Sequence, residues 1–328
     1  MSQETDTAKS YRDLIGALSK IKFQKNLQKR TVYIAKNSIT VYSTRQNYVE
    51  AFTQTLMNVE TQSHGSNVSI YLLPKEDLPL DFILQPFQYG HYQDQETSFM
   101  HNTNNNSIEI FDKKNLVLYI LSPNIDEFIE TILYSNLHYL KQVLNRLGHI
   151  NMHGAVVGRD GTGIFLANKG GSGKSSLMAY SLYRGMQTLG DDFLTLDAHD
   201  PYVFYSIFRH FKLNNSSPAY RLIKGSFNPM GQQRDGKDIF EIPEILLQRK
   251  MRVKEILIPF LGKNIGISEI SKDDALRKLL PSTLFLNHTV ALTIATMKVL
   301  IDEIPVYSLE LNPNMEQAYE LLEERLVN

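Results

Sequence analysis

The sequence contains no cysteine among its 328 residues. A chain without cysteine forms no disulfide bonds, offers no thiolate nucleophile and cannot build zinc or iron–sulfur sites on cysteine ligands. The absence also fits the reducing cytosol, which is where we expect this protein to act.

Strong net charge and long apolar stretches are missing as well. The formal net charge is −1, with 21% charged and 42% apolar residues, as in an ordinary globular protein. This balance gives no indication of nucleic-acid binding or of attraction to an acidic membrane. No apolar run approaches the roughly 20 residues needed to cross a bilayer, and the polar start of the chain lacks the apolar core of a signal peptide. We therefore expect a cytoplasmic protein with no membrane or nucleic-acid partner.

The length of the chain suggests two domains, and a long predicted helix separates its halves. Residues 1–122 mix helical and strand patterns and include a predicted hairpin of residues 31–35 and 38–43. Apolar residues then recur at helical spacing, which predicts an amphipathic helix over residues 124–147. We expect an α/β protein with a mixed α+β N-terminal recognition domain at 1–122 and a catalytic domain at 123–328.

The second domain alternates short strands and helices. Its predicted elements are strands at 150–157 and 164–167, a helix at 175–184, an interrupted strand at 187–196, strands at 253–260 and 305–311, and a helix that begins at Asn314. The stretch from 214 to 238 is rich in Asn, Ser, Gly and charged residues, which predicts a mobile loop.

A glycine-rich stretch joins the predicted strand at 164–167 to the helix that follows. It reads Asn168-Lys169-Gly170-Gly171-Ser172-Gly173-Lys174-Ser175-Ser176. Between a strand and a helix, such a stretch is typical of a phosphate-binding loop, because its backbone N–H groups and the helix N-terminus attract anions. We expect residues 170–176 to hold a nucleotide, with Lys174 at the β- and γ-phosphates and Ser175 on Mg²⁺.

The motif departs from the strict pattern G-x-x-x-x-G-K-[ST] at its first glycine, where Asn168 stands. Asparagine tolerates left-handed backbone angles better than most residues, so we expect Asn168 to replace that glycine without breaking the loop. The alternative is a glycine-rich turn that contains Gly-Lys-Ser by chance.

An acidic pair, Asp191-Asp192, follows on the element directly after the loop's own helix. Phosphoryl transfer to a hydroxyl needs a carboxylate for the metal and a second group near the acceptor. We expect Asp191 to bind Mg²⁺, directly or through water, and Asp192 to accept or orient the acceptor proton. The alternative is a simple Asp-Asp turn between strands, and His153 could likewise be an ordinary core histidine.

These residues together resemble the catalytic domain of bacterial HPr kinase/phosphorylase, which shares a P-loop fold with phosphoenolpyruvate carboxykinase. The resemblance is carried, in order and spacing, by His153-Gly154-Ala155, the Gly-Gly-Ser-Gly-Lys-Ser loop, Arg184-Gly185 and Asp191-Asp192. It implies that His153 contacts the phosphate region, Asp191 binds the metal and Asp192 serves the acceptor hydroxyl. True HPr kinases form rings, so the resemblance also leaves a homo-oligomer open.

The chain lacks the glycine-rich signature that true HPr kinases carry after the acidic pair, which argues against HPr as acceptor. It is more similar to the HPr-kinase-related enzymes of peptide-tailoring pathways, such as lasso-peptide kinases, and a related branch phosphorylates free serine. The acceptor class implied by the resemblance is therefore a serine hydroxyl on a peptide or small protein, with free serine or a similar metabolite as the alternative.

Phosphoryl transfer usually needs one more cation over the γ-phosphate. The predicted loop at 214–238 offers Lys224, Arg234 and Lys237, of which we favour Arg234 for catalysis and Lys237 for nucleotide binding. A solvated loop is the alternative interpretation of these charges.

A different class of protein is indicated by residues 299–303, an apolar run that ends in Asp302-Glu303. In a transporter-type or motor ATPase, Asp302 would bind Mg²⁺ and Glu303 would activate water. No Leu-Ser-Gly-Gly-Gln-like signature accompanies the run, and its apolar spacing also fits the end of an amphipathic helix. The sequence therefore favours an ATP- and Mg²⁺-dependent serine kinase, with an ATPase or nucleotide sensor as an alternative.

Overall fold

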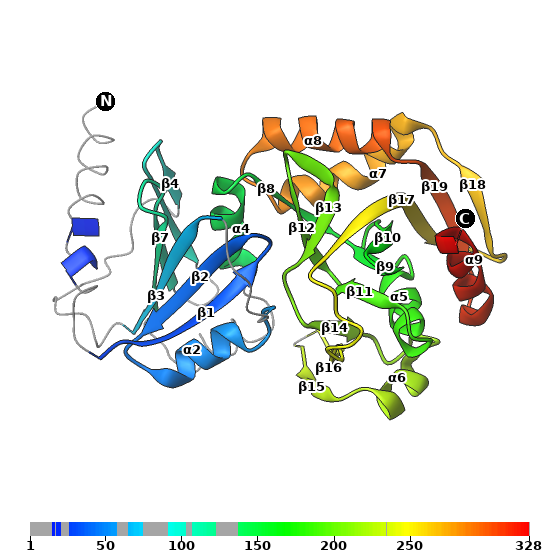
Figure 1. The fold of residues 1–328 in the computed structure, drawn as a ribbon, viewed down its shortest axis with the longest axis horizontal. Helices are drawn as coiled ribbons and strands as arrows, with labels where there is room; N and C mark the ends of the chain where they lie inside the picture. The colour runs from blue at the N-terminus through cyan, green and yellow to red at the C-terminus, as the bar shows by residue number, and fades with distance from the viewer. Residues whose placement is uncertain are drawn as a thin grey trace. The chain divides into compact units, whose positions relative to one another are not determined.

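The computed structural model describes residues 15–16, 18–20, 26–57, 65–74, 91–102, 107–122, 137–233 and 235–327. The chain divides into two compact units, Met1–Val143 and Leu144–Asn328, and combines helices with β-sheets (Figure 1), which confirms the predicted α/β class. Helix α4 (Leu137–Arg146) is the described part of the predicted long helix; residues 123–136, next to the predicted domain boundary, lie outside the described residues. Within the ranges given, no helix has the length and apolar character needed to span a bilayer.

The N-terminal unit is built on a seven-stranded sheet of order β1-β2-β3-β7-β6-β5-β4. The predicted hairpin is confirmed, since β1 (Gln28–Ile34) pairs antiparallel with β2 (Asn37–Ser43). The neighbours β2, β3 and β7 are parallel, and every residue of β7 is buried, as expected for strands covered on both faces. The remaining elements are α2 (Gln46–Thr53), β3 (Asn67–Pro74), β4 (His91–Gln93), β5 (Thr97–Asn102), β6 (Ser107–Asp112) and β7 (Val117–Ser122).

The C-terminal unit contains a nine-stranded sheet of order β11-β9-β10-β17-β13-β12-β8, with β19 added to β17 and β18 added to β19. Its strands are β8 (His149–His153), β9 (Ala155–Arg159), β10 (Thr162–Leu166), β11 (Gln187–Gly190), β12 (Phe193–Asp197), β13 (Asp200–Ser206), β17 (Lys250–Leu261), β18 (Gly266–Glu269) and β19 (Val306–Leu311). The strands β10, β17 and β19 are parallel and form the apolar centre of the sheet.

Helices cover both faces of this sheet, and successive side chains along each strand pack against opposite faces. Ile164 and Leu166 pack with α5 (Lys174–Tyr183) and α9 (Met315–Val327) on one face. Phe165, between them, packs on the other face with α7 (Lys272–Phe285) and α8 (Val290–Glu303). Figure 1 shows α7 and α8 along one side of the sheet and α5 with α9 on another. The phosphate-loop motif therefore lies at the end of a strand that is anchored on both faces.

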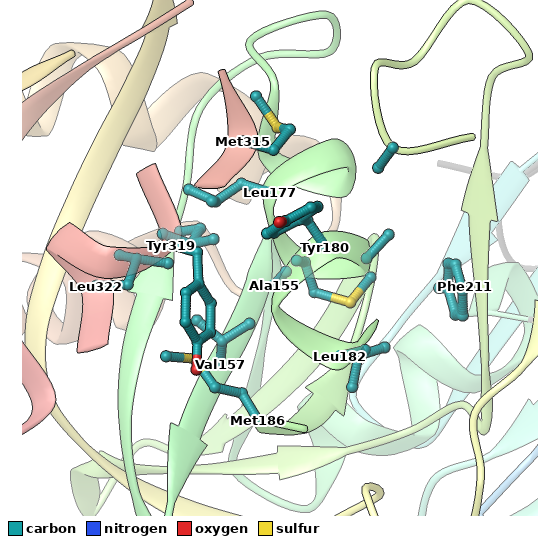
Figure 2. Packing of buried hydrophobic residues seen from close by; sticks show 14 of the residues in the cluster. Ala155, Val157, Leu177, Tyr180, Leu182, Met186, Phe211, Met315, Tyr319 and Leu322 are labelled. Atoms are coloured by element: carbon teal, nitrogen blue, oxygen red, sulfur yellow. The ribbon is translucent and has the colours of Figure 1, made fainter. Parts of the chain in front are cut away.

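Helix α5 is held in place mainly by apolar contacts with α9 and β9. In Figure 2 the side chains of Leu177 and Tyr180 from α5 lie next to those of Met315 and Tyr319 from α9. All four are buried, and each such side chain contributes about 1.5–3 kcal/mol when it is removed from water. This packing fixes the direction in which the N-terminus of α5 points.

Two long strands form a bent pair that carries the predicted catalytic residues. Residues 149–159 run antiparallel to residues 187–197, with β8 paired to β12 and β9 paired to β11. Both strands break at the same level: Gly154 interrupts the first, and Asp191-Asp192 interrupts the second. The Gly154 N–H donates to the Asp192 carbonyl oxygen at 3.2 Å across this break. The predicted single strand at 150–157 is thus two strands, and the interruption predicted at Gly190–Asp192 is confirmed.

Residues 214–238, predicted to be a mobile loop, instead contain helix α6 (Tyr220–Ser226) and strand β15 (Pro229–Gln232). Strand β15 joins β14 (His210–Leu213) and β16 (Asp238–Glu241) in a small sheet of order β14-β16-β15. The prediction was wrong because the polar composition of the segment hid apolar residues that are spaced four apart, as on one face of a helix. Ile223 and Phe227 are buried, and the Phe227 ring meets the Phe211 ring edge-on at 5.5 Å.

The edge strand β8 is completed by a buried asparagine rather than by another strand. The Asn287 side chain accepts from the Asn151 backbone N–H at 2.9 Å and donates to the Asn151 carbonyl oxygen at 2.9 Å. Asn145 Nδ2 also donates to Asn287 Oδ1, at 2.7 Å. These bonds satisfy both backbone groups of Asn151 on the open side of β8, the strand that ends at His153.

We expect Asn287→Ala to destabilise the C-terminal unit by about 1–3 kcal/mol, because it leaves buried backbone and side-chain groups without partners. Urea unfolding followed by circular dichroism measures this change. Asn264→Ala, at an exposed position, is the matched control and should change the free energy of unfolding by less than about 0.5 kcal/mol. Equal effects of the two substitutions would contradict the assigned role of Asn287.

Candidate active site

The glycine-rich stretch forms a tight loop between β10 and α5. Gly171 and Gly173 adopt φ angles of +78° and +95°, in the left-handed region where glycine carries no Cβ penalty. Gly173 is the N-cap of α5, so the loop ends at the positive end of a helix whose first N–H groups are unpaired. The loop therefore has the backbone geometry of an anion-binding site.

Asn168 stands in the loop without breaking it, as predicted, but not by a left-handed backbone angle, since it is not among the described residues with positive φ. Its side chain instead ties the loop to the neighbouring strand: Nδ2 donates to the Pro259 carbonyl oxygen at 2.7 Å. Its Oδ1 accepts from the Lys169 backbone N–H at 2.8 Å. The position that is glycine in the strict motif is used here to fasten the loop to β17.

Lys174 is buried and its side chain curls back over the loop. Its Nζ donates to the Asn168 and Lys169 carbonyl oxygens at 2.6 and 3.0 Å. Burial lowers the pKa of Lys174 from its ordinary value, an effect opposed by the charges of Asp191 and Asp192. The ammonium group thus sits in the concavity of the loop and interacts electrostatically with both acids.

The first acid of the pair lies beside the start of α5. The Ser175 hydroxyl donates to Asp191 Oδ1 at 3.1 Å, and the Asp191 side chain is almost fully buried. Its second oxygen, Oδ2, is buried without a hydrogen-bond partner in the described part of the chain. Burial, and then the charge of Asp192, raise the pKa of Asp191 to about 7. A buried carboxylate with a spare oxygen next to a hydroxyl is a fitting pair of ligands for a hard cation.

The second acid points to a different environment. Asp192 has a φ angle of +67°, which is uncommon outside glycine, and this turn separates its side chain from that of Asp191. Its Oδ2 lies 3.2 Å from Lys212 Nζ, its Oδ1 lies 3.9 Å from His153 Nε2, and its side chain is 25% exposed. Burial alone would raise the pKa of Asp192, but the charge of Lys212 and the hydrogen bond that Lys212 donates oppose it, so the pKa is lowered. Asp192 is therefore the ionised, accessible member of the pair.

His153 ends β8 and faces the acidic pair across the break in the bent strands. Burial, and then the charge of Lys174, lower its pKa, so the imidazole is neutral at pH 7. The next residue has to be glycine, because a Cβ at Gly154 would overlap the Phe165 ring and the Leu166 carbonyl oxygen. His153 is thus brought to the same place as Lys174 and Asp192.

The three cations predicted in residues 224–237 have different positions. Lys237 forms an ion pair with Asp235 at 2.9 Å; that hydrogen bond, reinforced by the charges of Asp192 and Asp191, raises the pKa of Lys237. Lys224 lies over the Tyr220 ring, 5.6 Å from its centroid, on the exposed side of α6. Arg234, our favoured candidate, lies outside the described residues.

Two residues near the site were missed by the sequence analysis. Lys212, on β14, pairs with Asp192 as described above, and the Ser217 hydroxyl donates to the Ser176 hydroxyl at 2.8 Å. The available signal for Lys212 was a lysine between two apolar residues, Phe211 and Leu213. Ser217 had no comparable signal, because its partner is 41 positions away.

Asp302 and Glu303 lie at the opposite end of the sheet from the loop. They are the last two residues of α8 and precede β19, whereas the far end of β19, Leu311, approaches Gly173. A six-residue strand is roughly 20 Å long. Asp302 pairs with Lys272 at 3.2 Å and lines a hollow of about 330 Å³ at that end. The predicted helical interpretation of this run is confirmed.

Comparison with protein-family models gives no match to this chain, and no curated protein matches it in sequence.

We expect Asp191→Asn to stabilise the metal-free protein above pH 7. The raised pKa of Asp191 means that the folded state holds a proton that the unfolded chain has lost, so stability falls as pH rises from about 4 to about 7. The variant escapes this loss, and its advantage in Tm should grow over that range to several degrees, at about 2–4 °C per kcal/mol. Thermal unfolding in EDTA at pH 4.5 and pH 8 measures it.

Asp192→Asn is the matched comparison and should lower the Tm at pH 8. The pKa of Asp192 is lowered, so its contribution to stability is present above about pH 4 and is lost on acidification. The substitution also leaves the buried Lys212 ammonium without its partner. Changes of the same sign for the two variants at pH 8 would contradict the assigned environments.

Proposed function

We propose that this protein is an ATP- and Mg²⁺-dependent kinase that phosphorylates a serine-type hydroxyl, on a peptide or small protein, with an HPr-kinase-like P-loop domain as its catalytic part. The observation that carries the proposal is the division of labour within Asp191-Asp192. One carboxylate is buried against Ser175 at the start of α5, and the other is accessible between Lys212 and His153. Phosphoryl transfer to a hydroxyl needs these two functions side by side.

The phosphate groups of the nucleotide would occupy the loop. Its backbone N–H groups and the N-terminus of α5 supply hydrogen bonds and partial positive charge. Lys174 Nζ now donates to two loop carbonyl oxygens, and phosphate oxygens would replace these acceptors with a stronger, charge-assisted interaction. Of the two described candidates, Lys237 is favoured over Lys224 for the γ-phosphate, because the charges of Asp192 and Asp191 contribute to its raised pKa.

Ser175 and Asp191 would hold Mg²⁺. The orphaned Asp191 Oδ2 gives the ion a buried, preformed oxygen ligand, and the Ser175 hydroxyl lies beside the same carboxylate. Mg²⁺ is usually bound through one or two carboxylates, with water and substrate phosphates completing its shell. Bound there, the ion would neutralise charge on the phosphates. Among the residues with described positions, no group of three or more His, Asp or Glu side chains could hold a metal alone.

Asp192 would act on the acceptor. Its exposed fraction leaves room for a hydroxyl to approach, and its lowered pKa keeps it ionised and able to accept a hydrogen bond. Because the transition state of phosphoryl transfer is loose, orienting the hydroxyl matters more than removing its proton early. The neutral imidazole of His153 lies with Nε2 3.9 Å from Asp192 Oδ1, where it would contact the transferred phosphoryl group.

Two other functions remain as alternatives. Free serine or a similar metabolite is the alternative acceptor, since a partly exposed carboxylate such as Asp192 would serve a small molecule as well as a peptide. An ATPase that uses Asp302 and Glu303 has less support, because these residues lie at the end of β19 away from Gly173.

We expect the purified protein to transfer ³²P from γ-labelled ATP, with Mg²⁺, to a hydroxyl acceptor. The acceptors to be offered are free L-serine and a pool of peptides with one fixed serine and randomised flanking positions. Label in the peptides supports the proposal, label in serine supports the small-molecule alternative, and release of inorganic phosphate alone supports the ATPase. This last result would overturn the kinase proposal.

We expect site variants to separate nucleotide binding from transfer. Lys174→Ala should weaken ATP binding as well as turnover, whereas Asp192→Asn should lower kcat by about 10²–10⁴-fold with little change in ATP affinity. Isothermal titration with a non-hydrolysable ATP analogue and the ³²P assay measure the two quantities. The controls Asp302→Asn and Glu303→Gln should retain wild-type kcat. Loss of activity in these controls with an active Asp192→Asn variant would contradict the assignment.

A further inference from the structure

Lys212 is an unusual residue for the centre of a strand. Lys174 and Lys212 are the two buried lysines among the residues that the structure describes, and lysine is almost never fully buried unless it is paired. The neighbours of Lys212 on β14, Phe211 and Leu213, point into the apolar core beneath α5. The alternation of the strand therefore turns Lys212 to the opposite side, toward the acidic pair.

The contacts of Lys212 fix one side of Asp192. Nζ lies 3.2 Å from Asp192 Oδ2 and 5.9 Å from the centroid of the Phe193 ring. On the other side of the carboxylate, Oδ1 faces His153 Nε2 at 3.9 Å. The backbone turn at Asp192 aims the side chain, and Lys212 limits how the carboxylate can rotate.

We propose that Lys212 is a positioning residue for phosphoryl transfer: it holds the Asp192 carboxylate by Oδ2 so that Oδ1 is presented to the acceptor hydroxyl. This inference rests on the proposed function and adds to it a residue outside the motifs. The proton of the acceptor hydroxyl passes to Asp192, and the hydroxyl oxygen forms the new bond to the γ-phosphorus as the bond to the β–γ bridging oxygen breaks. Lys212 takes no part in bond making and acts through Asp192.

Fold stability does not by itself account for this lysine. A buried ion pair contributes little net stability, because the cost of removing both charges from water offsets their attraction. The apolar contacts of β14 are supplied by Phe211 and Leu213, and its backbone is paired with β16 over four residues. A fixed charge beside the accessible carboxylate has a clear use in orientation, where a displacement of about 1 Å can cost 100-fold in rate.

The test is a comparison of Lys212→Met with Lys212→Arg in the ³²P assay, using the acceptor labelled best by the wild type. We expect Lys212→Met to lower kcat by about 100-fold while the dissociation constant for the ATP analogue changes by less than about threefold. Lys212→Arg keeps the charge and should recover at least about tenfold of the loss. Lys298→Met, at an exposed lysine of α8, is the control and should behave as wild type.

A double-mutant cycle decides whether Lys212 acts through Asp192. If it does, adding Lys212→Met to Asp192→Asn should lower kcat by less than about threefold further, because the carboxylate that it positions is already gone. Fully additive losses, an unchanged kcat in Lys212→Met, or a loss of ATP affinity as large as the loss of kcat would each overturn the proposal. If Lys212→Met fails to fold, Lys212→Gln, which keeps a hydrogen-bond donor without the charge, takes its place in the cycle.

The outcomes also separate this proposal from the one on which it rests. A wild-type protein that labels no acceptor overturns the kinase function and, with it, the role of Lys212. A wild type that labels an acceptor while the cycle is additive overturns the role of Lys212 alone.

Discussion

The hydrogen bond from Ser175 to Asp191 is the contact on which the site depends. It joins the first turn of α5 to the break in the bent strand pair, two parts of the chain that are 16 residues apart. Packing against α9 fixes the helix, and pairing with residues 149–159 fixes the strand, so neither side of this bond can adjust freely. Lys174 precedes Ser175, Asp192 follows Asp191, and His153 pairs with Phe193 in the strand register, so this contact brings the three residues into one site.

The site shows how one dipeptide can provide two chemically different carboxylates. Asp191 and Asp192 are consecutive, yet burial raises the pKa of one while nearby cations lower the pKa of the other. The two side chains leave the turn at Asp192, where φ is left-handed, toward different partners: Ser175 for Asp191 and Lys212 for Asp192. Environments that move the pKa values of neighbouring acids apart are typical of sites where the two acids have separate roles.

Local patterns predicted much of this arrangement. The hairpin at β1 and β2, the strand–loop–helix of residues 162–183 and the break at Asp191 were all readable, because apolar period and turn residues act over short distances. Lys212 and Ser217 were not, because their partners come together only through the small sheet β14-β16-β15. Asn168 was recognised as a departure from the motif, but its tie to Pro259 depends on a strand 91 positions later.

The segment that runs from β14 to α6 makes two polar contacts with the site, Lys212 with Asp192 and Ser217 with Ser176 at the start of α5. Thermodynamic linkage makes any such coupling reciprocal. If a ligand in the loop stabilises the packing of β14 and α6 against the site, that packing strengthens the binding of the ligand by the same free energy. Residues 214–238, whose composition suggested only a solvated loop, can thereby affect how long a ligand stays bound at the phosphate loop.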